Sequence, residues 1–143
     1  MSKSNALETA ILALIYNATA ITDLAENDPT SPATNIYVAL HTGDPGEAGT
    51  QATNEAAYTS YARVAVSRNS GGWTVSGNLA TNTADVTWPS CTGGTSTVTH
   101  WSTGLGASGA TAILHSGALT ASLIVNPGIA PGAGAGELDI TED

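Results

Sequence analysis

Hydrophobic residues near the start of the chain recur at spacings of three and four, which is the period of an amphipathic helix. The apolar positions are Leu7, Ile11, Leu14, Ile15, Ala18, Ile21 and Leu24. Asn5 followed by Glu8 has the spacing of an N-terminal capping box. Two X-Pro pairs within residues 28–32 end the pattern, because the residue before a proline is pushed out of the α region. The spacing predicts one helix over residues 5–25, either packed on the core of its own chain or docked as an arm on a neighbouring subunit.

From residue 35 onward the apolar positions alternate with a period of two, which is typical of β-strands. Residues 35–41 are the clearest example, because Ile36, Val38 and Leu40 share one face. The same alternation continues between turns that contain glycine. It predicts further strands at residues 61–67, 73–76, 84–89, 98–102, 110–115 and 119–125.

The end of the chain combines a low-complexity segment with renewed alternation. Residues 126–136 are rich in Gly, Pro and Ala and have the composition of a flexible linker. Residues 137–141 then place Leu138 and Ile140 on one face. They predict a final acidic strand that returns to a sheet edge, with a disordered acidic tail as the alternative.

Short strands joined by glycine turns favour an antiparallel sheet structure over βαβ units. The predicted fold class is mainly β, an antiparallel β-sandwich or barrel of about seven to eight strands preceded by one N-terminal α-helix. A chain of 143 residues is expected to form one core. The predicted organisation is a helix and linker at 1–34 and a β-sandwich body at 35–143, which includes segment 126–136 and the final acidic strand.

Charge narrows the range of partners. Three basic residues stand against twelve acidic ones, which gives a net charge of −9. Because affinity for nucleic acid is built from Lys and Arg that displace counterions, no nucleic-acid partner is predicted. The apolar run at residues 10–15 is too short to span a bilayer, so no membrane partner is predicted. Residues 61–136 hold only Asp85 and two arginines, a pattern typical of a surface that is buried or covered by neighbours.

Groups with catalytic or metal-binding chemistry are few and poorly spaced. The spacing of the histidines does not indicate a metal site, because no two lie within five residues: His41, His100 and His115. Ser102 shares a strand face with His100 without contact, and no G-x-S-x-G motif is present. A sugar-cleaving carboxylate pair would have to be Asp44 and Glu55. Cys91 has no basic neighbour in sequence and is expected to be a small buried side chain. We therefore expect no enzymatic activity, no metal and no cofactor.

A long polar loop and three tryptophans are the candidate contact features. The loop, residues 42–57, carries Asp44, Glu47 and Glu55. A calcium site is the alternative to a solvated acidic loop there, and loops of this length in compact domains are usually functional or belong to an interface. Trp73, Trp88 and Trp101 are expected to anchor the core, with sugar stacking by exposed tryptophans as the alternative.

Three short stretches together resemble a known family. They are YVALHTGDPG at residues 37–46, NE at 54–55 and YAR at 61–63, followed by a GW and GN pair at residues 72–78. This combination resembles the "LHTxDPG…NE…YAR" signature of a family of virion structural proteins of tailed bacteriophages, and the likeness covers most of the chain from residue 35. Members of that family are described as head decoration or cement proteins, or as tail fibre or minor tail proteins.

The resemblance implies a non-enzymatic virion protein that is assembled in the host cytoplasm. The first hypothesis is a capsid decoration protein that stabilises the outer surface of the head shell. Its partners would be the major capsid protein and copies of itself, in a homo-oligomer such as a trimer. The alternative is a tail fibre or tail-tip module that contacts the host surface. The candidate partner contacts are His41, Asp44, Glu47, Glu55, Trp88 and Trp101.

Overall fold

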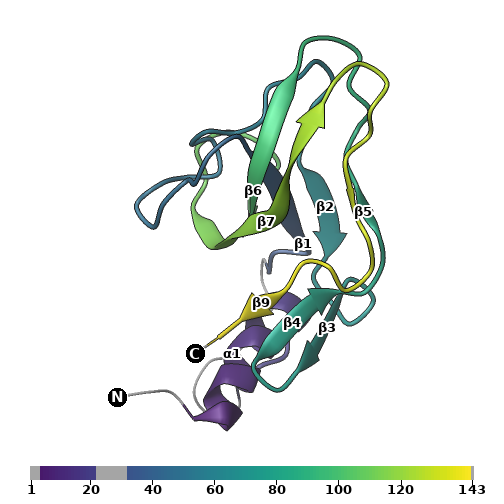
Figure 1. The fold of residues 1–143 in the computed structure, drawn as a ribbon. Coiled ribbons are helices and arrows are strands. Elements are labelled where there is room, and N and C mark those ends of the chain that lie inside the picture. The colour runs from purple at the N-terminus through teal and green to yellow at the C-terminus, as the bar shows by residue number, and fades with distance from the viewer. Residues whose placement is uncertain (1–3, 22–31, 143) are drawn as a thin grey trace. The chain divides into compact units, whose positions relative to one another are not determined.

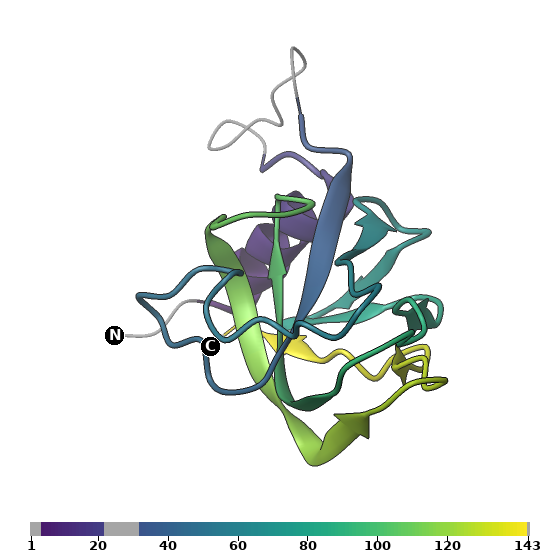
Figure 2. The same cartoon turned by 90° about the horizontal axis from the view of Figure 1, so that it is seen from above.

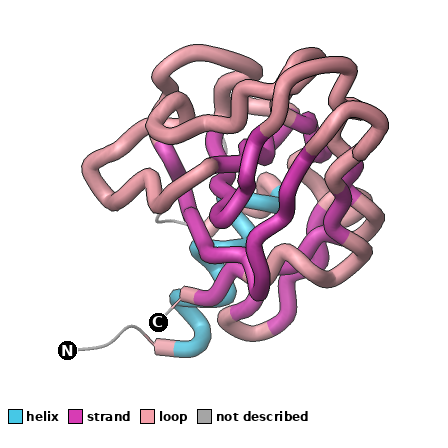
Figure 3. Tube along the Cα trace, turned by 45° about the horizontal axis from the view of Figure 1, so that its top comes forward, coloured by secondary structure: helices cyan, strands magenta, loops and turns pink. Residues whose placement is uncertain are grey.

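The computed structural model of the protein describes residues 4–21 and 32–142. The chain divides into two compact units that are interleaved in sequence. Unit 1 consists of Met1–Asn35, Val66–Val86 and Ala133–Asp143, and unit 2 of Ile36–Ala65 and Thr87–Gly132. Figure 1 labels their helix and most of their strands, and Figure 3 shows how much of the chain lies in loops between the strands. The prediction of a mainly β, antiparallel fold behind one N-terminal helix is confirmed, and within the described residues no sheet closes into a barrel.

Unit 1 begins with helix α1 (Asn5–Asn17), which is shorter than predicted. Its N-cap is Ser4, one residue before the predicted cap, and the Ser4 hydroxyl accepts a hydrogen bond from the Leu7 amide. The helix ends because Ala18 adopts a left-handed conformation with φ 54°. The predicted extension to residue 25 is therefore wrong between residues 18 and 21, and residues 22–25 lie outside the described part.

Arg68 explains where the helix stops. Its guanidinium donates hydrogen bonds to the carbonyls of Leu14 and Ile15, in the last turn. Those carbonyls have no partner inside a helix that ends at Asn17, and a basic side chain placed there satisfies them and interacts favourably with the helix dipole. The C-terminal end of α1 is thus fixed by a residue more than fifty positions away in sequence.

Helix α1 packs on the sheet of its own unit, which confirms core packing over a docked arm. Its buried residues follow one stripe, Glu8, Leu12 and Tyr16, and Leu7 from the predicted stripe is exposed. The Tyr16 ring lies 4.6 Å from the Trp73 ring, centroid to centroid. This aromatic pair joins the helix to strand β3 (Trp73–Ser76).

The sheet of unit 1 has the order β3-β4-β9, with β4 at Leu79–Asn82 and β9 at Ile140–Thr141. The predicted final strand at a sheet edge is confirmed, because β9 pairs antiparallel with β4 and both Leu138 and Ile140 are buried. Asn82 secures the approach to this strand. Its amide nitrogen donates to the Gly134 carbonyl at 2.8 Å, and its oxygen accepts from the Leu138 amide at 2.9 Å.

A four-stranded sheet has the order β2-β1-β6-β7. Its strands are β1 (Asn35–His41), β2 (Val64–Ser67), β6 (Ser96–Gly104) and β7 (Ile113–Val125). Figure 2 shows β1 in blue beside the green strands β6 and β7. The predicted buried face of β1 is confirmed, since Ile36, Val38 and Leu40 are all buried. The remaining strands, β5 (Val86–Thr87) and β8 (Gly132–Ala133), form a short pair.

The two strands predicted at 110–115 and 119–125 are one strand, β7. The prediction treated Gly117 as a turn, but Gly117 lies inside the strand opposite Trp101. A Cβ atom at this position would lie 3.1 to 3.2 Å from atoms of the Trp101 indole. The glycine is therefore explained by the close approach of the tryptophan, and the chain does not turn there.

None of the helices in the described part of the chain has the length and apolar character needed to cross a membrane.

Candidate functional site

The polar loop that follows β1 is closed at its base by residues of the sequence motif. The Thr42 amide donates to the Asn54 carbonyl at 2.7 Å, and the Asn54 side chain donates to the Asp44 carbonyl at 3.1 Å. Next to them, the His41 imidazole bonds the Thr53 carbonyl at 2.8 Å through Nδ1. Residues 42–54 thus form a loop whose two ends are joined by side-chain and backbone hydrogen bonds.

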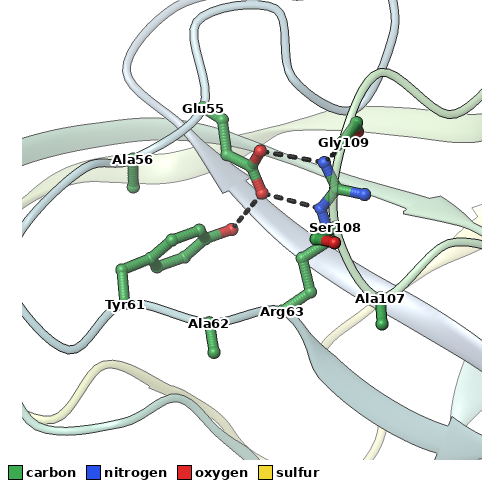
Figure 4. Close-up of a pocket in the computed structure, with 8 residues that line it drawn as sticks. All are labelled: Glu55, Ala56, Tyr61, Ala62, Arg63, Ala107, Ser108 and Gly109. Carbon is green, nitrogen blue, oxygen red and sulfur yellow. Dashed lines mark hydrogen bonds and ion pairs between the residues drawn. The ribbon is translucent and has the colours of Figure 1, made fainter.

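Arg63 and Glu55 form a two-pronged ion pair directly after this loop (Figure 4). Arg63 Nε lies 2.7 Å from Glu55 Oε1, and Nη2 lies 2.9 Å from Oε2. The Tyr61 hydroxyl donates to the same carboxylate at 3.1 Å and accepts from the Leu40 amide at 3.0 Å. Burial raises the pKa of Tyr61, so its hydroxyl stays a proton donor at neutral pH. The arginine side chain is 1% exposed and that of Glu55 19%.

The rest of the Arg63 guanidinium holds a second loop, residues 105–111. It donates to the carbonyls of Gly106 at 2.9 Å and Gly109 at 2.7 Å, and to the Thr111 hydroxyl at 3.0 Å. Gln51 reinforces this link, because its Oε1 accepts from the Thr111 hydroxyl and its Nε2 donates to the Tyr37 carbonyl. One buried arginine therefore fastens both loops to the body of unit 2.

The two fastened loops, residues 42–54 and 105–111, are here called the loop surface. Asp44 and Glu47 are exposed in the first loop, and Leu105 is 52% exposed in the second. An open pocket of about 240 Å³ borders the second loop and is lined by Glu55, Tyr61, Ala62, Arg63 and residues 107–109 (Figure 4). The Glu55 carboxylate already accepts hydrogen bonds from Arg63 and Tyr61. The pocket is therefore better suited to contact with the surface of a partner than to catalysis on a substrate.

The structure separates the predicted contact residues into two groups. Asp44 and Glu47 are exposed, and Glu55 is partly exposed within its ion pair. His41, Trp88 and Trp101 are buried, with 0%, 2% and 6% of their surfaces exposed. Burial removes these last three from the candidate contacts.

Core anchoring by the tryptophans is confirmed. Trp73 is 0% exposed, and the buried Trp88 indole donates to the Val38 carbonyl at 3.2 Å. Sugar stacking on Trp88 or Trp101 is not available in this structure, because both rings are buried.

Ser102 is paired with His41, a contact that the sequence spacing did not indicate. His41 Nε2 lies 2.7 Å from the Ser102 hydroxyl. Because the Thr53 carbonyl only accepts hydrogen bonds, Nδ1 carries the proton and Nε2 accepts from the serine. The pair resembles a nucleophile and its base, but both residues are 0% exposed and a substrate has no access. It is a buried structural hydrogen bond between β1 and β6.

Burial lowers the pKa of His41, and this makes a testable prediction about pH. The folded state disfavours the imidazolium, while an unfolded chain takes up a proton near pH 6.5. This contribution to the free energy of unfolding is constant above that pH and falls as the pH drops below it. We expect the His41→Gln variant to lose less stability than the wild type between pH 7 and about pH 5 in urea titrations. Equal slopes in the two proteins would contradict this account of His41.

The other reactive side chains do not gather into a site. Within residues 4–21 and 32–142, no group of three His, Cys, Asp or Glu side chains is placed to hold a metal ion. Cys91 is buried, as expected, and its thiol donates to the Gly93 carbonyl at 3.3 Å.

Comparison with known families identifies the class of protein. A family model described as "Gp80: Podophage GP4 fiber I protein gp80" matches residues 2–141, so the chain belongs to this family. The protein is therefore a structural component of a phage virion. No curated protein matches the chain. The description of the family as a fibre protein fits the tail-fibre hypothesis better than capsid decoration.

Proposed function

We propose that the chain is a non-enzymatic component of a tail fibre and that its loop surface contacts the host cell. The observation that carries the proposal is the family match, which spans residues 2–141 and names a fibre protein. The Arg63 network supports it, because a contact surface that is held in one conformation before binding loses less entropy on binding.

The loop surface has the features that a contact site needs. The buried Arg63 guanidinium bonds Gln51 of the first loop and Gly109 of the second. Asp44 and Glu47 of the first loop and Leu105 of the second are exposed. A surface with acidic groups and an apolar side chain suits a partner that offers both cationic or polar groups and apolar area. Placement of contact residues on loops held by a firm scaffold is a common solution for binding proteins.

Capsid decoration, with the major capsid protein as partner, is the competing hypothesis. It shares the non-enzymatic role and the virion location with the proposal. The two differ in copy number, because a decoration protein is present in numbers comparable to the major capsid protein, whereas a fibre protein is far less abundant. Quantitative mass spectrometry of purified particles therefore separates them.

Competition for adsorption tests the host contact. Host cells are incubated with an excess of purified protein and then with phage, and free phage is counted. We expect the wild-type protein to reduce adsorption and Glu47→Lys, at the exposed tip of the first loop, to reduce it less. Asp139→Lys is the matched control, because it makes the same charge change at an exposed site outside the loop surface.

Each outcome of this competition bears on the proposal. If the wild-type protein leaves adsorption unchanged at saturation, the host-contact role is wrong. If the wild type competes but Glu47→Lys and Asp139→Lys compete equally well, the contact does not involve the tip of the first loop.

A further inference from the structure

Strand β7 has one edge that pairs with no strand of residues 4–21 and 32–142. In the four-stranded sheet it is the last strand, and its paired edge bonds to β6. Its beginning is covered by the first loop, through the bridge between Thr50 and Ala112 and the hydrogen bond from the Gln51 amide to Thr111. Beyond this bridge, no strand among the described residues pairs with the outer edge of β7 (Figure 2). The backbone groups of that edge form a ready template for another strand.

The usual protections of a sheet edge are largely missing from β7. Natural edge strands are short, carry charges or proline, or are bent away by bulges. Residues Ile113–Val125 contain no charged residue and no proline over 13 positions. The pairing of β7 with β6 has two irregularities, because residues 119–122 lie opposite Thr99 alone and the register shifts again between Thr103 and Gly104. They leave two regularly paired arms, 115–118 and 123–125, whose outer edges pair with no strand among the described residues.

The second arm also exposes apolar side chains on both of its faces. Leu123 is 36% and Ile124 59% exposed, and neighbouring residues of a strand point to opposite faces. Ile129, in the turn that follows, is 43% exposed. Of the five large apolar residues that are exposed in the described chain, three therefore lie within residues 123–129. The end of β7 therefore leaves apolar surface on both faces, which the side chains of a neighbouring strand can cover in part.

Charge identifies the partner that fits this edge. The chain has a net charge of −9, yet residues 86–136 contain no Asp, Glu, Lys or Arg. Two copies of so acidic a protein repel each other wherever their carboxylates meet, and this repulsion is weakest along the uncharged edge. A basic partner would be recognised by acidic residues, which this edge lacks. A second copy of the same chain offers an equally uncharged, equally apolar strand.

We propose that β7 pairs along its free edge with β7 of a second copy of this chain. An antiparallel pair of identical strands is self-complementary, so each copy gives and receives the same backbone hydrogen bonds. Cross-strand neighbours in such a pair cover part of the Leu123 side chain on one face and part of the Ile124 side chain on the other. The proposal does not depend on host binding by the loop surface, and its test needs neither host cells nor phage.

Molar mass in solution tests the proposal. We expect the wild-type protein to sediment as an oligomer that dissociates on dilution, and Ile124→Lys to sediment as a monomer at the same concentrations. A lysine reduces the net negative charge, so general repulsion between copies decreases and cannot explain dissociation. Leu105→Lys is the matched control, since it places the same charge at a similarly exposed apolar residue outside β7, and we expect it to stay oligomeric.

Hydrogen exchange of the wild-type protein gives a second measurement that does not depend on a variant. Raising the protein concentration is expected to slow exchange in peptides from residues 113–125 more than elsewhere. The proposal is overturned if the wild type is monomeric at high concentration, if Ile124→Lys remains as oligomeric as Leu105→Lys, or if concentration-dependent protection lies outside β7. Circular dichroism spectra of both variants confirm that each is folded before its mass is interpreted.

Discussion

Replacement of Arg63 by Ala is expected to lower the free energy of unfolding by about 3–5 kcal/mol, the usual cost of breaking a buried ion pair from one side. The arginine side chain is 1% exposed and bonds Glu55, Gly106, Gly109 and Thr111 at once. Its loss leaves the Glu55 carboxylate, 19% exposed, without its counter-charge. Urea unfolding followed by circular dichroism measures the change.

Two further variants separate the ion pair from the fork geometry of the guanidinium. Arg63→Lys keeps the charge but cannot form both bonds to Glu55 together with the bonds to the second loop, so we expect a loss between those of the wild type and Arg63→Ala. Adding Glu55→Gln to Arg63→Ala removes the unpaired carboxylate and is expected to restore part of the stability. If Arg63→Ala lowers the free energy of unfolding by less than about 1 kcal/mol, the ion pair contributes no more than an exposed one does, and the structural role of Arg63 is contradicted.

Trp73→Ala is expected to have a comparable effect, about 3–5 kcal/mol, because it leaves a large cavity in unit 1. Trp73 is 0% exposed and its ring lies against Tyr16, so the variant also removes the aromatic contact between β3 and α1. Circular dichroism is the appropriate probe, since the substitution removes one of three tryptophans and changes the fluorescence.

Trp73→Phe is the informative companion of this variant. It keeps an aromatic ring against Tyr16 and removes the indole Nε1, a buried donor without a hydrogen-bond partner among the described residues. We therefore expect a smaller loss than for Trp73→Ala. Leu105→Ala serves as the exposed control, with an expected change within about 0.5 kcal/mol. Equal losses for Trp73→Ala and Leu105→Ala would show that Trp73 does not anchor the helix.

Local sequence patterns predicted those parts of the fold that local physics determines. The alternation of Ile36, Val38 and Leu40 identified β1, and that of Leu138 and Ile140 identified the final strand. The helix end was missed because it depends on Arg68, far away in sequence. The continuity of β7 was missed for a similar reason, because Gly117 is needed for contact with Trp101 and not for a turn. Long-range contacts of this kind leave no periodic signal.

That the polar loop contacts a partner stays a prediction, and the structure adds which of its residues are exposed and how they are held. The sequence singled out the loop with Asp44 and Glu47, and both residues are exposed. It included His41 among the contacts, although His41 is buried under the loop. The role of Arg63 was missed, even though one of only two cations in a nearly uncharged stretch is itself a signal for a buried partner. Which acid it pairs with, and which carbonyls it reaches, follows only from the fold.

The most direct test of the central claim, a fibre component of the virion, is the location of the protein on intact particles. Antibodies raised against the purified protein and coupled to gold are bound to phage and viewed by electron microscopy. We predict gold at the fibres of the tail and none over the head shell. Gold spread evenly over the head would contradict the fibre role and restore capsid decoration.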